Sequence, residues 1–405
     1  MTTYSAFCFE KIGAEDLTSI TKTLPQDLSG DQVLIKVHAC GACHSDCFSQ
    51  TGAMTSANCY PLIPGHEVIG EVVSTGPGAI ASSFLKGDMV GVGWHGQNCY
   101  SCDACVAGDT ICCARLKANL HPTPPHRHDS TTIPVVPSAA LCGCALAQLY
   151  FQLVSVSAYL HFLSHSPPYP VLANAAVLQV SGLHFDGGYA EYMVGHAGSL
   201  ARVPAGMSAV EAAPLLCAGV TVYNAIAHNN KHAVPGALVA VMGIGGLGHL
   251  GIQYAAKMGY RVAAISRGTA KKALAEQLGA KYFIDSTATN PAEELTKLGG
   301  AALILATAFN SEAMTALIDG LGRNGVLVVL GATPEPINVS PFQILGQRKS
   351  IRGHPSGNAK DSEHAMQFAH ANGVKCQVLE FPLAKAPEAY ASMQAGNFRV
   401  VINAK

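Results

Sequence analysis

A cluster of cysteines is the first place where this sequence could support chemistry. The stretch "CYSCDACVAGDTICC" runs from Cys99 to Cys113 and puts five cysteines into fifteen residues. Four of them have a spacing with which one chain reversal can bring four thiolates to a tetrahedral zinc ion. A site closed by four sulfurs has no free position for a substrate, so it would be structural. The four are Cys99, Cys102, Cys105 and Cys113; Cys112 is a competing fourth ligand, and free buried cysteines are the other alternative.

A second, dispersed set could hold a catalytic metal. Cys43 lies in "GACHSD", His66 in "PGHE" and Cys217 in "APLLCAG", each at a turn or at the end of an expected element. Two thiolates and one imidazole would cancel the charge of zinc and leave its fourth position open for water or an alcohol oxygen. Taken singly, a histidine or cysteine is more often a packed core residue, so these three predict a site only together with the family resemblance given below.

A glycine-rich turn follows a short apolar stretch in the second half of the chain. "ALVAV" predicts a buried strand, and "MGIGGLGHLG" leads from it into a helical pattern. Glycines at such a turn let the backbone approach a pyrophosphate, whose charge is met by the helix N-terminus. A tight turn that serves packing alone is the alternative. The predicted cofactor-binding residues here are Gly243, Gly245, Gly246, Leu247 and Gly248.

The end of the next expected strand, "RVAAIS", indicates which dinucleotide would bind. An NAD site usually carries an acidic residue there, which binds the ribose hydroxyls. In this chain Ser266 is followed by Arg267, with Lys271 and Lys272 shortly after, and no carboxylate is present. A hydroxyl with cations suits the additional phosphate of NADP, so we expect NADP to be favoured over NAD. A solvated helix start is the plain structural alternative.

The elements that must position these residues are of two kinds. "QVLIKVH" and "HEVIGEVVSTG" alternate apolar and polar residues, so the N-terminal part is expected to be β-rich. From Val234 onward, short apolar stretches such as "KYFID", "AALILATA" and "GVLVVLG" alternate with helical segments such as "TAKKALAEQLG". This alternation predicts an α/β protein with a doubly wound parallel sheet. The predicted domains are catalytic at 1–215, with a zinc lobe at 95–115, cofactor-binding at 216–350, and a return to the catalytic domain at 351–405.

The composition excludes some classes of partner. The 405 residues contain 25 Lys and Arg against 26 Asp and Glu, so charge gives no reason to expect nucleic acid or acidic lipid. A chain of this length needs no disulfides to fold, and its N-terminus shows no secretory or transit signal. We expect a cytoplasmic protein with a small-molecule ligand and no membrane or nucleic-acid partner. In that compartment, the 14 cysteines favour metal thiolates over disulfides.

One segment, at about 117–180, fits neither domain pattern. Between Ser130 and Phe185 the sequence has no Lys, Arg, Asp or Glu, and both flanks are rich in proline and histidine. We expect an atypical insertion here, which is either a genuine lid or a gene-model artefact such as translated intron sequence.

The order of these motifs resembles the zinc-containing alcohol dehydrogenases of the medium-chain dehydrogenase/reductase family, in particular the microbial and cinnamyl-alcohol-dehydrogenase-like members. The resemblance covers nearly everything outside the insertion. It implies a GroES-like β-rich catalytic domain beside a Rossmann cofactor domain, two zinc ions per chain, and a homo-oligomer, a dimer or tetramer, built through the cofactor domain. The motifs that carry it are "GACHSD", "PGHEVIGEV", the four-cysteine lobe, "DGGYAEY", "APLLCAGVTVY" and "GIGGLGHLGIQYA".

The resemblance also implies roles for single residues. Cys43, His66 and Cys217 would be the catalytic zinc ligands. Asp46 would hold the far nitrogen of His66, and Glu67 would lie behind the metal. The residues implied at the cofactor are His44 and Arg399, at its phosphates, and Thr221, beside the nicotinamide.

The implied reaction is reversible hydride transfer between an alcohol and NAD(P). Zinc would make the alcohol acidic, Ser45 would take its proton, and the nicotinamide would accept hydride. Many family members continue the proton relay with a histidine where this chain has Phe48. Phe48 and Trp94 would instead wall the substrate pocket, which favours an apolar primary alcohol or aldehyde.

Two other classes of function remain open at this point. A zinc-free quinone or enoyl reductase of the same fold would keep the glycine turn but would not need Cys43, His66 and Cys217 together. A non-catalytic NADP-binding or redox-sensing protein would have its cleft blocked by the insertion.

Overall fold

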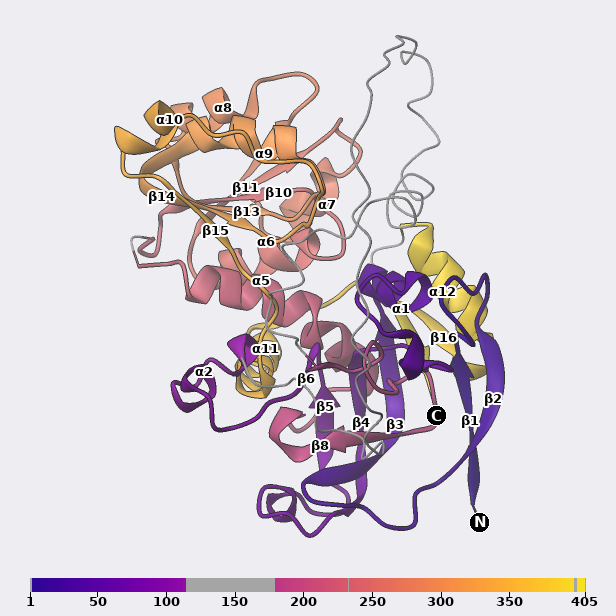
Figure 1. The fold of residues 1–405 in the computed structure, drawn as a ribbon. Coiled ribbons are helices and arrows are strands. Elements are labelled where there is room, and N and C mark those ends of the chain that lie inside the picture. The colour runs from indigo at the N-terminus through magenta and orange to yellow at the C-terminus, as the bar shows by residue number, and fades with distance from the viewer. Residues whose placement is uncertain (1, 114–178, 232, 397–398, 405) are drawn as a thin grey trace, which may run out of the picture.

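The chain forms two domains, each built on its own β-sheet (Figure 1). The computed structural model describes residues 2–113, 179–231, 233–396 and 399–404. The insertion expected at about 117–180 falls outside these residues, apart from its last two positions.

The catalytic domain is organised around the strand that leads to Cys43. Strand β3, Gln32–Ala42, pairs antiparallel with β4, Glu67–Thr75, on one side and with β17, Val400–Asn403, on the other. The sheet runs β16–β17–β3–β4–β5–β9, and β8 also pairs with β3. The further strands are β16 Leu379–Pro382, β5 Met89–Val92, β9 Leu200–Arg202 and β8 Tyr192–His196. Strands from both ends of the chain therefore lie beside β3.

Short elements surround this sheet. Two small antiparallel pairs are β1 with β2 and β6 with β7. These strands are β1 Thr3–Cys8, β2 Thr18–Thr23, β6 His95–Gln97 and β7 Gln179–Val180. The helices are α1 Cys47–Thr51, α2 Asp103–Val106, α4 Ala209–Ala212 and α12 Ala386–Gln394. The 3₁₀ turns are η1 His44–Asp46, η2 Ala57–Cys59, η3 Ala81–Ser83, η4 Thr110–Cys112, η5 Ala197–Ser199, η6 Ala213–Leu216 and η8 Leu383–Lys385.

The cofactor domain is a six-stranded parallel sheet with the strand order β12–β11–β10–β13–β14–β15. This is the order of a Rossmann fold, and it confirms the predicted doubly wound sheet. The order reverses between β10 and β13, where such sheets bind their ligands. The strands are β10 Leu238–Met242, β11 Arg261–Ser266, β12 Tyr282–Asp285, β13 Ala301–Ala306, β14 Leu321–Val329 and β15 Ser350–Gly353. The helices are α5 Ala218–Ala227, α6 Gly248–Lys257, α7 Lys272–Gln277, α8 Pro291–Lys297, α9 Ser311–Leu317, α10 Pro341–Leu345 and α11 Ala359–Asn372, with the 3₁₀ turn η7 Ile318–Gly320.

Burial explains why "ALVAV" reads as a continuous apolar run. Every residue of β10 is buried, because helices cover both faces of a parallel sheet. Val239 and Val241 pack into a core with α5 and α6, while Leu238, Ala240 and Met242 pack into a core on the opposite face, with α8 and α9. Alternate side chains thus serve opposite layers, as the period of a strand requires.

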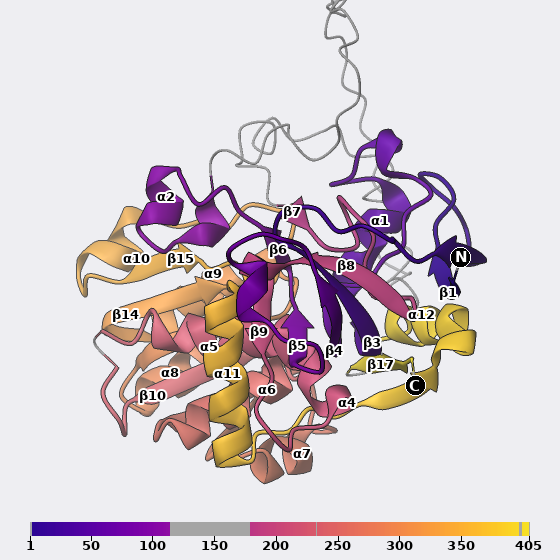
Figure 2. The same ribbon diagram turned by 90° about the horizontal axis from the view of Figure 1, so that it is seen from below.

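One of these cores joins the two domains. It contains Ala39 of β3, Ile69 of β4 and Val401 of β17 together with residues of α5, α6 and β10. Helix α11 contacts α5 on one side and β9 on the other, and Figures 1 and 2 show it at the junction of the domains. Within the described ranges no single helix has the length and hydropathy to cross a bilayer; one bent pair, Ala209–Leu216 with Ala218–Ala227, passes by length and composition only.

Two glycines of the predicted turn have identifiable conformational reasons. Gly243 has a φ of 93°, in the region that favours glycine. A Cβ at Gly248 would overlap the carbonyl oxygen of Gly243, so the first turn of α6 could not approach β10 as it does. Gly245 has open space where a Cβ would be, which leaves its surface free for a ligand.

We predict that Gly248→Ala destabilises the fold by about 1–3 kcal/mol, because a methyl group would have to displace backbone and not a flexible side chain. Urea unfolding would measure this loss. Gly346→Ala is the matched control: Gly346 has a right-handed φ of −59° and open space around the added Cβ, so its free energy of unfolding should be unchanged or slightly higher. Equal stability of the two variants would contradict the packing argument.

Candidate active site

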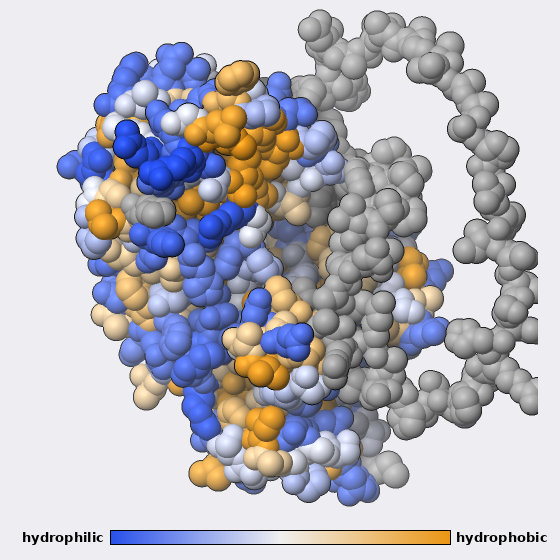
Figure 3. All heavy atoms as spheres, turned by 60° about the vertical axis from the view of Figure 1, so that its left-hand side comes forward, coloured by the Kyte–Doolittle hydropathy of each residue, from blue (hydrophilic) through white to orange (hydrophobic). Residues whose placement is uncertain are grey.

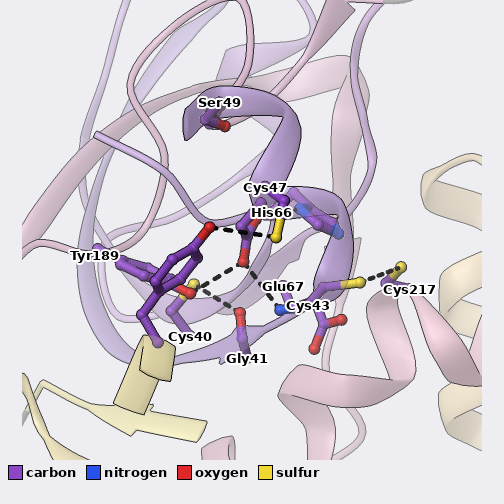
Figure 4. A network of polar contacts seen from close by, with 12 residues as sticks. Cys40, Gly41, Cys43, Cys47, Ser49, His66, Glu67, Tyr189 and Cys217 are labelled. Carbon is purple, nitrogen blue, oxygen red and sulfur yellow. Dashed lines mark hydrogen bonds and ion pairs between the residues drawn. The ribbon is translucent and has the colours of Figure 1, made fainter. Parts of the chain in front are cut away.

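The dispersed set of predicted metal ligands converges on one point. Cys43 follows β3, His66 immediately precedes β4, and Cys217 lies between η6 and α5. Their ligand atoms, with a carboxylate oxygen of Glu67, all lie within 4.8 Å of one another, and the two sulfurs are 4.0 Å apart. Figure 4 shows the side chains of Cys43 and Cys217 facing each other. With Zn–S bonds of about 2.3 Å, two sulfurs on a tetrahedral zinc would be separated by about 3.8 Å, so the spacing fits this ion.

The imidazole of His66 is oriented for the same point. Its Nδ1 lies 2.9 Å from Oδ1 of Asp46, which is the contact predicted for Asp46. Its Nε2 is buried and has no hydrogen-bond partner within the described residues. A buried nitrogen without a partner is costly, and a metal ion would satisfy it. The ring of Trp94 packs edge-on against His66 at a centroid distance of 4.9 Å.

Asp46 connects several groups behind the ligands. Its Oδ2 accepts hydrogen bonds from the backbone N–H of Cys43, at 2.9 Å, and from the hydroxyl of Tyr189, at 3.0 Å. Asp46, His66 and Tyr189 are all completely buried. Both oxygens of the carboxylate are thus engaged, and Asp46 restrains two predicted metal ligands, His66 by its ring and Cys43 by its backbone.

The two sulfurs shift each other's pKa in opposite directions. The hydrogen bond between them lowers the pKa of Cys43 well below its usual value, and it raises the pKa of Cys217 well above it. Burial opposes protonation of His66, yet Asp46 and Cys43 outweigh it and raise the pKa of His66 to about 9. A divalent cation would remove this conflict, because it permits two thiolates beside a neutral imidazole.

Glu67 is paired with an arginine from the other end of the chain. Its completely buried carboxylate forms an ion pair with the guanidinium of Arg399, which is 5% exposed. A Cβ at Gly41 would overlap this carboxylate, so glycine is needed on the strand beside it. Arg399 thus balances the charge of Glu67, whose carboxylate lies beside the ligand atoms of Cys43, His66 and Cys217.

The four-cysteine lobe closes as the spacing predicts. The sulfurs of Cys99, Cys102, Cys105 and Cys113 lie within 4.8 Å of one another. Two of the distances, from Cys99 to Cys105 and from Cys102 to Cys113, are 3.9 Å. Cys112 is exposed and lies outside this group, so the structure selects Cys113 as the fourth member. Every cysteine in the described ranges is free of disulfide bonding.

A cavity of about 1000 Å³ lies between the domains. The cofactor domain contributes the glycine turn and the residues after its strands, and the catalytic domain contributes His44, Cys47 and the end of α12. Of the predicted cofactor residues, those that line it are His44, Gly243, Gly245, Ser266, Arg267 and Lys271. Gly246, Leu247 and Gly248 continue the turn into α6.

Lys271, which lines the cavity, also bonds to the glycine turn. Its Nζ donates a hydrogen bond to the carbonyl oxygen of Ile244 at 2.8 Å, which ties the start of α7 to the glycine turn. Burial lowers the pKa of Lys271. This contact leaves Arg267 as the predicted cation that is more available to a cofactor phosphate.

Several predicted residues lie elsewhere. Arg399 faces Glu67, and its Nη1 is 4.0 Å from Sγ of Cys43. The buried charge of Glu67 needs a cation beside it, and the contact of Arg399 with a cofactor phosphate stays a prediction. Thr221 is buried in the first turn of α5 and is not among the residues that line the cavity. Ser45 and Phe48 flank Asp46 and are partly buried.

Sequence reasoning missed other parts of the cavity. Ser286 and Thr287 follow β12, Phe309 and Asn310 follow β13, and Thr333 follows β14; all five line the cavity. The available signal was the rule that ligands bind beyond the carboxyl ends of parallel strands. Cys47 and Tyr189 carried no comparable signal, because only the folded chain brings them to the cavity and to Asp46.

Comparison with known proteins agrees with this geometry. Residues 29–126 match the family model described as an alcohol dehydrogenase GroES-like domain, and residues 246–371 match the one described as a zinc-binding dehydrogenase. An alcohol dehydrogenase of Penicillium expansum is 38% identical over 99% of this chain and 97% of its own length. One from Geobacillus stearothermophilus is 32% identical over 93% of each chain. The structure of a cinnamyl alcohol dehydrogenase from Sorghum bicolor, 25% identical, superposes with a TM-score of 0.72 over 99% of this chain and 98% of that one.

The chain therefore belongs to the zinc-type alcohol dehydrogenases of the medium-chain dehydrogenase/reductase family. It is an oxidoreductase that acts on a small-molecule substrate with zinc and a nicotinamide cofactor.

We predict that Tyr189→Phe weakens zinc retention at the catalytic site by on the order of tenfold, because the carboxylate of Asp46 loses a buried donor and its hold on His66 loosens. Competition with a chelator would measure the affinity. Tyr390→Phe is the matched control: it also removes a buried hydroxyl, which contacts Cys47 and Gln50 instead of Asp46. Equal zinc affinity in the two variants would contradict the role of Tyr189.

Proposed function

We propose that this chain catalyses reversible hydride transfer between a primary or secondary alcohol and NADP, which it prefers over NAD, and that it holds two zinc ions per chain. The observation that carries the proposal is the convergence of Cys43, His66 and Cys217, with a buried imidazole nitrogen that has no protein partner. His44 and Cys47 lie on the same short segment as Cys43, and they line the cavity that begins at the glycine turn. The metal ligands and the dinucleotide cavity therefore share one short stretch of chain.

In this proposal each group of residues has a separate task. A bound zinc ion supplies Lewis-acid chemistry, which makes an alcohol more acidic or polarises a carbonyl, and a bound nicotinamide supplies the hydride acceptor or donor. Asp46 accepts a hydrogen bond from the N–H at Nδ1 of His66, so the Nε2 of the neutral ring carries no proton and is free to bind the metal. Ser45, adjacent to Asp46, takes the alcohol proton. Trp94, packed on His66, walls the substrate pocket with Phe48 and favours apolar substrates.

The preference for NADP is supported by charge at the end of β11. Ser266, Arg267 and Lys271 line the cavity there. Asp285, which pairs with Ser266 on the next strand, already accepts hydrogen bonds through its carboxylate from the backbone of Gly268 and from Thr287. It is therefore less available to ribose hydroxyls. A cinnamyl alcohol dehydrogenase from Helicobacter pylori, similar in fold with a TM-score of 0.71 at 23% identity, was solved with NADP(H).

We also propose a homo-oligomer, dimer or tetramer, in the cytoplasm. Strand β15 is at the open edge of the cofactor-domain sheet. On neighbouring α10, Phe342 is 90% exposed and Leu345 is 68% exposed. Figure 3 shows apolar side chains gathered on the upper part of one face of the molecule, which a second copy could cover. The free cysteines of the described ranges fit a reducing compartment.

The zinc count follows from the two ligand sets. We predict two zinc ions per wild-type chain by metal analysis, and about one for Cys113→Ser, because three thiolates hold the structural ion poorly. Cys112→Ser is the control and should retain both, since Cys112 lies outside the group. One ion or none in the wild-type chain would contradict the proposal and would favour, respectively, a lobe-only binder or a zinc-free reductase.

The activity itself is tested with a panel of aliphatic and aromatic alcohols in the presence of NADP or NAD. We expect alcohol-dependent reduction of the dinucleotide, with a higher kcat/KM for NADP. Ser45→Ala should lower turnover by at least about tenfold while both zinc ions are retained, because it removes the proton acceptor and no metal ligand. Unchanged turnover in this variant would remove Ser45 from the proton path, and absence of turnover in the wild-type chain on every alcohol would overturn the proposed reaction.

A further inference from the structure

A buried histidine stands at the start of α6, directly behind the glycine turn. His249 is the second residue of this helix and is completely buried. Its Nδ1 lies 3.0 Å from the carbonyl oxygen of Gly245, and its Nε2 lies 3.2 Å from the backbone nitrogen of Gln377. Gln377 belongs to the segment between α11 and β16, through which the chain returns to the catalytic sheet. One imidazole thus joins the glycine turn to the connection between the domains.

The partners of His249 define its protonation. A carbonyl oxygen only accepts, so Nδ1 must carry the hydrogen that points to Gly245. A backbone N–H only donates, so Nε2 must be unprotonated and accept from Gln377. His249 is therefore the neutral tautomer with its proton on Nδ1. Burial also lowers the pKa of this residue, which agrees with the neutral form.

The carbonyl of Gly245 receives a second bond from the same residue. The backbone N–H of His249 donates to it at 3.0 Å, as in the first turn of a helix. Two donors from one residue therefore hold the peptide that joins Gly245 to Gly246. A Gly–Gly peptide has the fewest steric restraints on its rotation, so it needs such an external restraint more than any other peptide would.

The orientation of this peptide decides where its other polar group points. In a planar trans peptide, the C=O and the following N–H point in opposite directions. Since the carbonyl of Gly245 is directed into the helix toward His249, the N–H of Gly246 must be directed out of the helix N-terminus. Gly245 itself lines the cavity and has open space on its surface. This is where an N–H would meet a pyrophosphate oxygen.

We propose that His249 is a positioning residue for the dinucleotide: through Gly245 it holds the Gly245–Gly246 peptide so that the N–H of Gly246 faces the pyrophosphate. This inference rests on the proposed role of the cavity as the cofactor site. His249 contacts the turn and not the reacting atoms, so it acts on cofactor affinity before it acts on the chemical step.

Three substitutions separate the two bonds of His249. Asparagine places an amide N–H near the position of Nδ1 and can still donate to Gly245. Glutamine places its oxygen near Nε2 and can accept from Gln377, while it loses Gly245. Phenylalanine keeps the shape of the ring and loses both. Gln253→Leu is the control on the same helix: Gln253 bonds the backbone of Lys375, in the same interdomain segment, and donates to the backbone carbonyl of His249, but these bonds involve neither the imidazole of His249 nor Gly245.

The measurement is calorimetric titration of the zinc-loaded protein with NADPH, together with kcat and the KM for alcohol at saturating cofactor. For H249F and H249Q we expect the dissociation constant of NADPH to rise by about tenfold, the effect of losing one buried hydrogen bond. H249N and Q253L should stay within about threefold of wild type. The KM for alcohol and kcat should be nearly unchanged in every variant that folds, which a general loss of structure would not produce.

Other results overturn the inference. Unchanged affinity in H249Q, or a loss in H249N as large as that in H249Q, would show that the peptide of Gly245 does not depend on His249. If H249F fails to fold, the pair H249N and H249Q decides. A wild-type chain that does not bind NADPH at all would overturn the proposed cofactor site as well, whereas a wild-type chain that oxidises alcohols while all variants bind alike would overturn only the role of His249.

Discussion

Two sulfurs and an imidazole nitrogen converge in a largely buried region, where two thiolates would repel each other unless a cation lay between them. The hydrogen bond between the sulfurs lowers the pKa of Cys43 and raises the pKa of Cys217. The surrounding groups are arranged for a cation in their midst: Asp46 restrains the ring of His66, and Arg399 removes the charge of Glu67 from competition. The antiparallel pairing of β3 with β4 brings Cys43, just after β3, close to His66, just before β4.

The division of the chain into two domains follows from the need for two different surfaces. The mostly antiparallel sheet positions the predicted metal ligands Cys43 and His66 at the ends of β3 and β4, while the parallel sheet provides strand ends and a helix N-terminus suited to a long anionic ligand. The cavity takes residues from both, and the core that contains Ala39, Val401 and the residues of α5 continues from one domain into the other. Because this core is shared, the domains cannot separate without exposing apolar side chains.

Much of this arrangement could be predicted from the sequence, for local reasons. The α/β fold class is confirmed, and strands of the parallel sheet such as β10 and β13 appear in the sequence as short apolar runs, whereas β15, with the sequence SIRG, does not. The glycine turn lies at the residues that its spacing predicts. The set of Cys43, His66 and Cys217 could be assembled only with the family resemblance, since no local pattern links Cys43 to Cys217.

The contacts that could not be predicted all join residues far apart in the sequence. Tyr189 reaches Asp46 across 143 positions, and Gln377 reaches His249 across 128. Arg399 pairs with Glu67, a contact that the sequence did not indicate, and its contact with a cofactor phosphate stays a prediction. Periodicity and turn chemistry describe neighbours along the chain, whereas these contacts depend on which buried charge or unsatisfied polar group each side chain meets after packing.

The position of β17 has a consequence for how the protein is made. This strand, Val400–Asn403, pairs with the end of β3 next to Cys43, and Arg399 directly before it neutralises a carboxylate near the metal ligands. A ribosome makes these residues after every other element of the described sheets. Until they have left the exit tunnel, the central strand β3 is unpaired on one side and Glu67 lacks its counter-ion, so the predicted catalytic centre can form only after they have emerged.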